Sequence, residues 1–162
     1  MKSTIAVCPG SFDPVTKGHV DIIQRAAKMF GQVIVVVMVN AAKSPLFTGD
    51  ERVDMLRRAL DHLPNVQVDS YNGLLAEYMT QVQGTAIVKG LRAVSDFEYE
   101  FQMALTNKKL CPKAETVFLT ADAQNMYLSS SIVKSVGSMG GDIMDFVPPQ
   151  VYEEIKQRLM QK

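Results

Sequence analysis

Two patterns of apolar and polar residues alternate along the chain. Short runs rich in β-branched residues predict strands, and the stretches between them repeat their apolar residues at the three- and four-residue spacing of amphipathic helices. The run at residues 33–39 is apolar on both faces, which is typical of a strand covered by helices on each side of a parallel sheet, so we expect it near the centre. The five predicted strands are residues 4–7, 33–39, 66–68, 86–88 and 116–119.

The stretches with helical spacing predict six helices. Thr48 and Glu51 have the spacing of a capping box before the second helix, and Pro64 is expected to close it. Pro148 and Pro149 suit the start of the last helix. Strands that alternate with helices, without repeats or linkers, indicate an α/β fold in one domain over residues 1–162: a Rossmann-like, doubly wound, five-stranded parallel sheet with helices on both faces. Apolar stripes place the helices within residues 20–30, 53–63, 75–82, 97–105, 132–136 and 151–159.

Composition narrows the class of protein. With 47% hydrophobic and 21% charged residues in 162, the chain is expected to fold on its own. Its 17 lysines and arginines equal its 17 aspartates and glutamates, so no overall positive field attracts a nucleic acid, and we expect no such partner. The longest apolar run, residues 33–39, is too short to cross a bilayer, and we expect no membrane partner. Cys8 and Cys111 lack the spacing of metal ligands or of a disulfide framework, which favours a reducing, cytoplasmic location.

Residues able to bind phosphate follow the predicted strands. The first strand runs into a loop with Gly10 and Ser11, where backbone amides can meet phosphate oxygens, and Gly18 lets a ligand approach closely beside His19. Taken singly, such residues are more often helix caps or solvated surface charges. However, His19, Lys43, Lys89 and Arg92 are all expected at the carboxyl edge of the sheet, where ligands of doubly wound folds bind.

The segment Pro9-Gly10-Ser11-Phe12-Asp13-Pro14, followed by Thr16 and Gly18-His19, resembles the signature of the bacterial phosphopantetheine adenylyltransferase family within the nucleotidylyltransferase superfamily. The resemblance covers nearly the full chain through further ordered blocks at residues 43–48, 89–92, 96–100 and 129–134. In one departure, Lys89 stands where the family usually has arginine, which keeps the charge but loses the planar fork that grips a phosphate with two hydrogen bonds.

The resemblance implies transfer of the adenylyl group of ATP to 4′-phosphopantetheine, giving dephospho-coenzyme A and pyrophosphate in coenzyme A biosynthesis. It also implies coenzyme A as a feedback ligand and a homohexamer. We expect Mg²⁺ to be carried with ATP, because it screens the charge of the leaving pyrophosphate, and the sequence shows no carboxylate cluster that would make the protein a metal ligand. The acceptor-binding residues would be Ser11, Lys43, Leu75 and Lys89. The ATP-binding residues would be Ser11, Phe12, His19, Gly90, Leu91, Arg92, Glu100, Asn125, Met126, Tyr127, Leu128, Ser129, Ser130 and Ser131.

The chemistry explains why such residue types are needed. A phosphate monoester is already ionised at neutral pH, so its attack on the α-phosphorus needs no strong general base, and catalysis rests on positioning and on stabilising charge. We expect His19 to stabilise the transition state and Lys43 and Lys89 to neutralise the acceptor phosphate, with Thr16 either binding at the same site or capping the helix. Arg92 suits the β- and γ-phosphates, and amides at Ser129–Ser131 suit phosphate oxygens at a helix start.

Three other functions are considered for this sequence. Another adenylyltransferase of the superfamily would use nicotinamide mononucleotide or a phosphorylated alcohol as acceptor, and acceptor screening would distinguish it. A class I aminoacyl-tRNA synthetase shares the Gly-His pair but needs a longer chain and a Lys-Met-Ser-Lys-Ser motif. A non-catalytic nucleotide sensor on the same fold would show no turnover.

Overall fold

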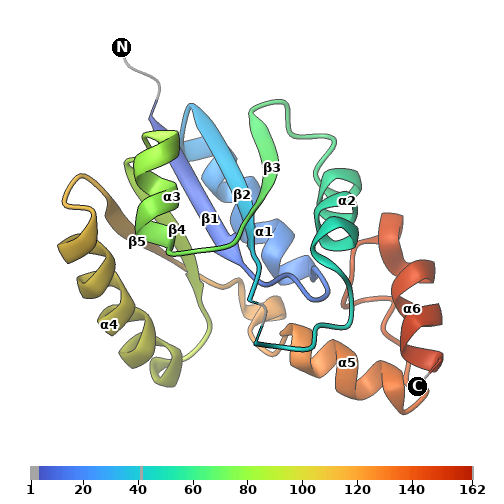
Figure 1. The fold of residues 1–162 in the computed structure, drawn as a ribbon. Coiled ribbons are helices and arrows are strands. Elements are labelled where there is room, and N and C mark those ends of the chain that lie inside the picture. Colours follow the sequence, from blue (N-terminus) through green and yellow to red (C-terminus); the bar gives the residue numbers. More distant parts are fainter. Residues whose placement is uncertain (1–3, 41, 162) are drawn as a thin grey trace.

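The computed structural model describes residues 4–40 and 42–161, and its centre is a five-stranded parallel sheet (Figure 1). The order of the strands across the sheet is β3-β2-β1-β4-β5. This confirms the predicted fold class and places the apolar run of residues 33–39 beside the central strand. The strands are β1 (Ile5–Gly10), β2 (Gln32–Met38), β3 (Val66–Tyr71), β4 (Ala86–Leu91) and β5 (Glu115–Thr120).

Six α-helices connect and follow the strands, and they cover both faces of the sheet (Figure 1). Alternate residues of β1 show the two faces: Ala6 packs in a cluster with α1, α2, α5 and α6, whereas Val7 packs in a second cluster with α3. The helices are α1 (Lys17–Met29), α2 (Gly49–Ala59), α3 (Leu75–Val82), α4 (Val94–Leu110), α5 (Ser130–Ser138) and α6 (Tyr152–Met160). The short 3-10 turns η1 (Ala123–Asn125) and η2 (Pro149–Val151) precede α5 and α6.

The order of the strands creates a switch point between β1 and β4. The chain builds outward from β1 through β2 to β3, then crosses back to place β4 on the other side of β1. The loops that leave β1 and β4 therefore turn in opposite directions and open a crevice beyond the carboxyl ends of these strands, which is where ligands of such sheets bind.

Element boundaries differ from the predicted ones at several places, and β1, β3 and β5 extend beyond the predicted runs. Strand β4 continues to Leu91 because Lys89 and its neighbours pair with β5, so Lys89 lies within the strand and not after it. Helix α2 ends at Ala59, ahead of the apolar residues Leu60 and Leu63 that were expected to continue it. The two prolines begin a 3-10 turn that leads into α6. The capping box of Thr48 and Glu51 is present as predicted.

Helix α4 is unusual because it exposes apolar side chains around its surface. Val94 is 82% exposed, Tyr99 64% and Leu105 57%, and Phe101 and Leu110 are also exposed. A helix that is apolar on several sides normally packs against more than one neighbour. Among the described helices, none is both long enough and apolar enough to cross a membrane.

Candidate active site

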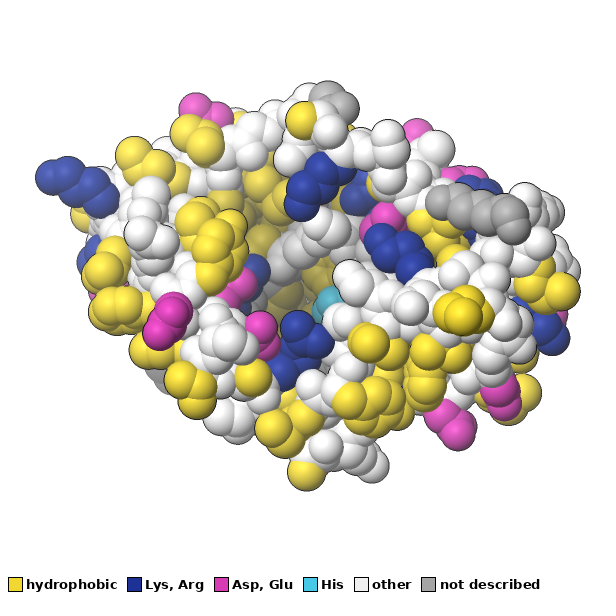
Figure 2. All heavy atoms as spheres, turned by 90° about the horizontal axis from the view of Figure 1, so that it is seen from below, with side chains coloured by type: hydrophobic (Ala, Val, Ile, Leu, Met, Phe, Trp, Pro, Cys, Tyr) yellow, Lys and Arg dark blue, Asp and Glu magenta, His cyan; other side chains and the backbone are white. Residues whose placement is uncertain are grey.

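The carboxyl ends of β1 and β4 open into a hollow that Figure 2 shows end-on, with lysine and arginine side chains on its rim and an imidazole inside it. We call this hollow the central pocket. It is formed by β1, β4, the first turn of α1 and the start of α5. The predicted site residues that line it are Phe12, Thr16, His19, Lys89, Gly90, Arg92, Glu100, Asn125, Leu128, Ser129 and Ser130.

His19 is fixed by the start of its own helix. Thr16 is the N-cap of α1, and its hydroxyl oxygen accepts a hydrogen bond from the backbone N–H of His19 at 3.2 Å. In return, the backbone N–H of Thr16 donates to Nδ1 of His19 at 3.0 Å. A backbone N–H only donates, so Nδ1 carries no proton, and the neutral ring must carry its proton on Nε2. The capping box thus leaves His19 with one N–H donor at the other end of the ring.

The surroundings of His19 keep its ring neutral. Burial, together with the positive charges of Arg92 and Lys89, lowers the pKa of His19 from 6.5 to about 4. The ring of Phe12 packs edge-on against the imidazole, with 5.0 Å between the ring centroids. At neutral pH, His19 therefore presents an uncharged hydrogen-bond donor in a fixed orientation.

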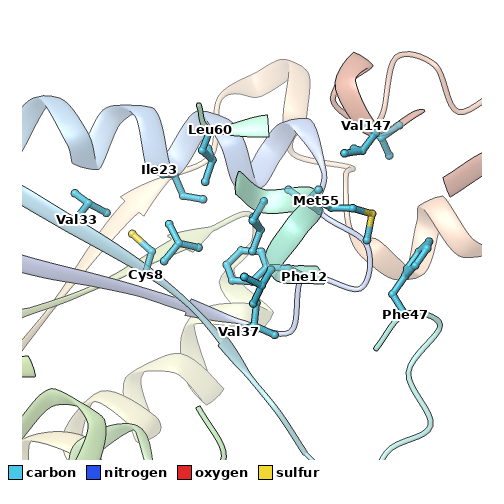
Figure 3. Close-up of a cluster of buried hydrophobic side chains, with 14 of the residues drawn as sticks. Cys8, Phe12, Ile23, Val33, Val37, Phe47, Met55, Leu60 and Val147 are labelled. Atoms are coloured by element: carbon cyan, nitrogen blue, oxygen red, sulfur yellow. The ribbon is translucent and has the colours of Figure 1, made fainter. Parts of the chain in front are cut away.

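Phe12 has its ring in the core, which anchors the loop after β1. The ring is 5% exposed and lies among Cys8, Val37 and Met55 in the cluster of Figure 3. Its φ of 48° is rare for a large residue and persists only where the surroundings hold it. Gly10 leaves room for it, since a Cβ at Gly10 would lie 3.0 Å from the Phe12 ring.

Lys89 and Arg92 bring two positive charges to the central pocket, and each is held by a carboxylate on α4. Nζ of Lys89 lies 3.5 Å from Oε2 of Glu100, and Nε of Arg92 lies 3.4 Å from Oδ2 of Asp96. Arg92 also donates to the carbonyl oxygen of Leu128 at 2.8 Å. This contact ties the end of β4 to the segment that precedes α5.

Lys43 lines a second hollow, which adjoins the central pocket at Ser130 and which we call the loop pocket. The buried carboxylate of Asp13 holds the loop that carries Lys43: it accepts hydrogen bonds from the backbone N–H groups of Leu46 at 2.8 Å and Phe47 at 2.9 Å. The same carboxylate lies 3.6 Å from Nζ of Lys134 on α5. Asp13 therefore connects the loop after β1, the Lys43 loop and α5.

Two arginines complete the support of these loops. Arg52, only 4% exposed, donates to the carbonyl oxygen of Ser11 at 2.9 Å and to that of Thr48 at 3.2 Å. Arg158 of α6 donates to the carbonyl oxygen of Leu46 at 3.0 Å, and its guanidinium carbon lies 4.7 Å from the centre of the Phe47 ring. The Lys43 loop is thereby clamped from both sides.

A third hollow lies between α4 and the sheet, and we call it the side pocket. Ser11, Leu75, Lys89 and Glu100 line it together with apolar residues such as Met103. Lys89 and Glu100 also line the central pocket, and Ser11 also lines the loop pocket. The three hollows therefore meet around the loop after β1.

The start of α5 supplies backbone donors to the central pocket. Ser129 is the N-cap of α5, and its hydroxyl oxygen accepts a hydrogen bond from the backbone N–H of Ile132 at 3.1 Å. The hydroxyl of Ser130 donates to the carbonyl oxygen of Pro14 at 2.7 Å, which joins α5 to the loop after β1. The unpaired amides of this helix start, with the positive end of its dipole, favour an anion in the pocket.

Most sequence-predicted site residues come together, but not all line the same hollow. Ser131 lines the loop pocket and Tyr127 a separate groove beside α1. Met126 is half exposed, and Leu91 is the last residue of β4. Sequence reasoning missed the supporting roles of Arg52, Arg158 and Lys134, and it did not identify the partners of Asp13, because buried contacts between distant segments leave no periodic signal. Among residues 4–40 and 42–161, no group of three or more His, Cys, Asp or Glu side chains could hold a metal ion.

The chain is similar to known proteins over nearly its full length. Residues 7–136 match a family described as cytidylyltransferase-like. The chain is 55% identical over 155 residues to a phosphopantetheine adenylyltransferase of Heliobacterium modesticaldum, covering 96% of this chain and 92% of that protein. It is 54% identical over 157 residues to a phosphopantetheine adenylyltransferase of Dictyoglomus turgidum, covering 97% and 98%.

Solved structures with little sequence identity share the fold. A putative nicotinate-nucleotide adenylyltransferase from Vibrio parahaemolyticus matches with a TM-score of 0.70 at 17% identity, over 94% of this chain and 98% of that one. A nicotinic acid mononucleotide adenylyltransferase of Plasmodium falciparum matches with a TM-score of 0.67 at 15% identity, over 98% and 97%. At such identity these likenesses concern the fold alone.

Proposed function

The chain belongs to the phosphopantetheine adenylyltransferase family, and from this premise we propose how its three adjoining pockets carry out the reaction. It is a nucleotidyltransferase that moves the adenylyl group of ATP to 4′-phosphopantetheine, giving dephospho-coenzyme A and pyrophosphate in coenzyme A biosynthesis. A phosphate oxygen of the acceptor forms a bond to the α-phosphorus of ATP, and the bond from that phosphorus to pyrophosphate breaks.

The central pocket holds ATP in this proposal. Arg92 binds the β- and γ-phosphates, and the backbone N–H groups of Ser129 and Ser130 donate hydrogen bonds to phosphate oxygens at the start of α5. Arg92 also donates a hydrogen bond to the carbonyl oxygen of Leu128, which keeps its guanidinium close to the start of α5 and so supports a shared phosphate site. Gly90, Glu100 and Asn125, on the same pocket, bind the adenosine part.

The acceptor phosphate binds at Ser11, where the side and loop pockets meet. Lys89 in the side pocket and Lys43 in the loop pocket then face it from two sides, and together they offset its repulsion from the triphosphate. The apolar lining of the side pocket, which includes Leu75, receives the pantetheine arm. Because the acceptor phosphate is itself the nucleophile, the reaction requires no nucleophilic side chain.

His19 stabilises the transition state as a neutral donor. Negative charge grows on the oxygens of the α-phosphate as the new bond forms, and a donor fixed in advance stabilises it without reorganising. The single observation that carries the mechanism is the capping box of Thr16 and His19, because it holds Nδ1 as the acceptor and leaves the Nε2 proton for the substrate. Thr16 thus acts as a positioning residue.

Mg²⁺ enters with ATP in this proposal and screens the charge of the leaving pyrophosphate. The donors around the central pocket are mainly cations, hydroxyls and amides, which suit phosphate better than they suit a metal ion. Coenzyme A contains the acceptor arm joined to an adenine nucleotide, so it can span the side and central pockets as a feedback ligand. We place the enzyme in the cytoplasm, without a nucleic-acid or membrane partner.

We also propose a homohexamer, and the surface of α4 supports an assembly of identical chains. Val94, Tyr99, Phe101 and Leu105 expose apolar side chains along one helix whose neighbours in the sheet cover only part of it. Several exposed apolar side chains on one helix of a folded protein are typical of a protein–protein interface.

Acceptor screening tests the function. The purified protein is incubated with ATP, Mg²⁺ and one acceptor at a time, and pyrophosphate release is measured with a coupled assay. We expect release with phosphopantetheine and none above background with nicotinamide mononucleotide or a phosphorylated alcohol. Release with nicotinamide mononucleotide but not with phosphopantetheine would overturn the assignment. Lys43→Met should impair turnover, whereas Lys28→Met, at an exposed position of α1, serves as the matched control.

A further inference from the structure

The ion pair between Lys89 and Glu100 forms part of the wall between the central and side pockets. Nζ of Lys89 lies 3.5 Å from Oε2 of Glu100, and the two side chains are 29% and 20% exposed. Both residues line both pockets. The same pair of opposite charges therefore faces the space proposed for the nucleotide and the space proposed for the acceptor.

The sheet fixes the position of the Lys89 Cα but not that of its ammonium group. Residue 89 pairs with Phe118 within the sheet, so its Cα is held by strand hydrogen bonds. Its ammonium group sits on a flexible four-carbon stem and carries three donors, so it can turn from a carboxylate to a phosphate oxygen without any movement of the sheet. An arginine fork could hold a carboxylate and a phosphate with different N–H groups at once. A single compact ammonium group satisfies the two less well.

Glu100 also has a direct effect on an incoming anion. Its carboxylate lines the side pocket beside Lys89, so a phosphate that approaches Lys89 is repelled by Glu100 at close range. With the acceptor absent, the carboxylate neutralises Lys89. With the acceptor bound, carboxylate and phosphate share one cation.

We propose that Glu100 is a built-in competitor of the acceptor: it holds Lys89 in the free enzyme, gives it up in part to the acceptor phosphate, and so sets the acceptor affinity. This inference rests on the proposed function and assigns Glu100 a role that acts through Lys89, beside its contact with adenosine. A competitor of this kind weakens the hold on the phosphate, which favours turnover over tight binding.

Replacing Glu100 with glutamine tests the proposal, because the variant keeps the shape of the side chain and removes its charge. Binding of 4′-phosphopantetheine is measured by titration calorimetry without ATP, so that any contact of Glu100 with adenosine is not involved. We expect Glu100→Gln to bind the acceptor about two- to fivefold more tightly than the unmodified enzyme, given what partly exposed ion pairs contribute. Glu98→Gln, an exposed position on the same helix, should bind as the unmodified enzyme does.

A double variant shows whether the effect passes through Lys89. Lys89→Met should weaken acceptor binding, and Lys89→Met with Glu100→Gln should gain clearly less from the loss of Glu100 than the unmodified enzyme does. Equal or weaker binding in Glu100→Gln would overturn the proposal, as would the full gain in the Lys89→Met background. If the unmodified enzyme releases pyrophosphate with phosphopantetheine while Glu100→Gln shows no gain, the inference fails and the proposed function stands. If the unmodified enzyme does not turn over, the proposed function itself fails.

Discussion

Substitutions of His19 can separate its two ring nitrogens. Asparagine places an amide oxygen near the position of Nδ1, where it can still accept the N–H of Thr16, but it has no group at the position of Nε2. Glutamine does the reverse: its amide N–H can reach the position of Nε2, while the acceptor for Thr16 is lost. The two variants therefore remove either the donor to the substrate or the capping bond.

The geometry gives the size of each effect. Loss of one preorganised donor to the transition state costs about 10²- to 10³-fold in kcat, or about 2.7–4 kcal/mol. Loss of a capping bond costs about 0.5–2 kcal/mol of stability. We expect His19→Asn to lose about 10²- to 10³-fold in kcat while its ATP dissociation constant stays within a few-fold. His19→Gln should keep more activity but unfold at lower urea concentration.

The assay combines steady-state pyrophosphate release, ATP binding by calorimetry and urea unfolding on the same preparations. Its pH dependence adds a second readout. Because the pKa of His19 is lowered from 6.5 to about 4, the folded ring stays neutral from pH 5 to pH 8, and kcat should show no step near pH 6.5 from this group. The unfolded chain takes up the proton near pH 6.5, so the stability linked to His19 is present above that pH and is lost as the pH falls toward 4.

Two results would refute this reasoning. One is a kcat for His19→Asn within tenfold of that of the unmodified enzyme, since the Nε2 donor would then matter little. The other is a kcat that rises as the pH falls through 6.5 and that loses this rise in His19→Asn, since the active form would then be the charged imidazolium.

Three further predictions concern parts of the molecule outside that ring. Asp13→Asn should lower the free energy of unfolding by about 1–3 kcal/mol in urea titrations, because one of two backbone N–H groups, part-buried at Leu46 and buried at Phe47, loses its acceptor. Unchanged stability would contradict the role of this carboxylate. Gly137→Ala should lower the melting temperature by several degrees, because the new Cβ would lie 2.5 Å from a methyl carbon of buried Leu159. Such a shift corresponds to about 1–3 kcal/mol of strain. An unchanged melting curve would show that α5 and α6 can separate freely. Leu105→Glu should reduce the mass measured by light scattering if α4 forms a subunit contact, and an unaltered assembly of several chains would exclude this position from the interface.

Strands and helices could be predicted from the sequence because their signals are local. β-branched runs identified all five strands, and parallel pairing with helix cover explains why residues 33–39 are apolar on both faces. Local signals failed where pairing between strands decides the outcome. Lys89 lies inside β4 because β5 pairs with it, which no pattern at residues 86–91 reveals.

The candidate site was predictable as a set of chemical groups but not as a geometry. His19 could be identified from its Gly-His segment. Its reciprocal hydrogen bonds with Thr16 could not be predicted, because the N3 residue of a capping box is usually Glu or Gln. Nothing near Lys43 indicates that Asp13 and Arg158 hold its loop, since these contacts join residues far apart in sequence. Such contacts follow only from the folded arrangement.

The contact of Arg158 with Leu46 and Phe47 affects when the active site can form during synthesis of the chain. Arg158 is translated more than a hundred positions after the loop that it grips, and Lys134 also emerges long after Asp13. A ribosome-bound chain that lacks α6 can form β1, β2 and their helices, but its Lys43 loop lacks the restraint from Arg158. The enzyme should therefore gain full competence late, when the arginine docks, and not when the sheet first assembles.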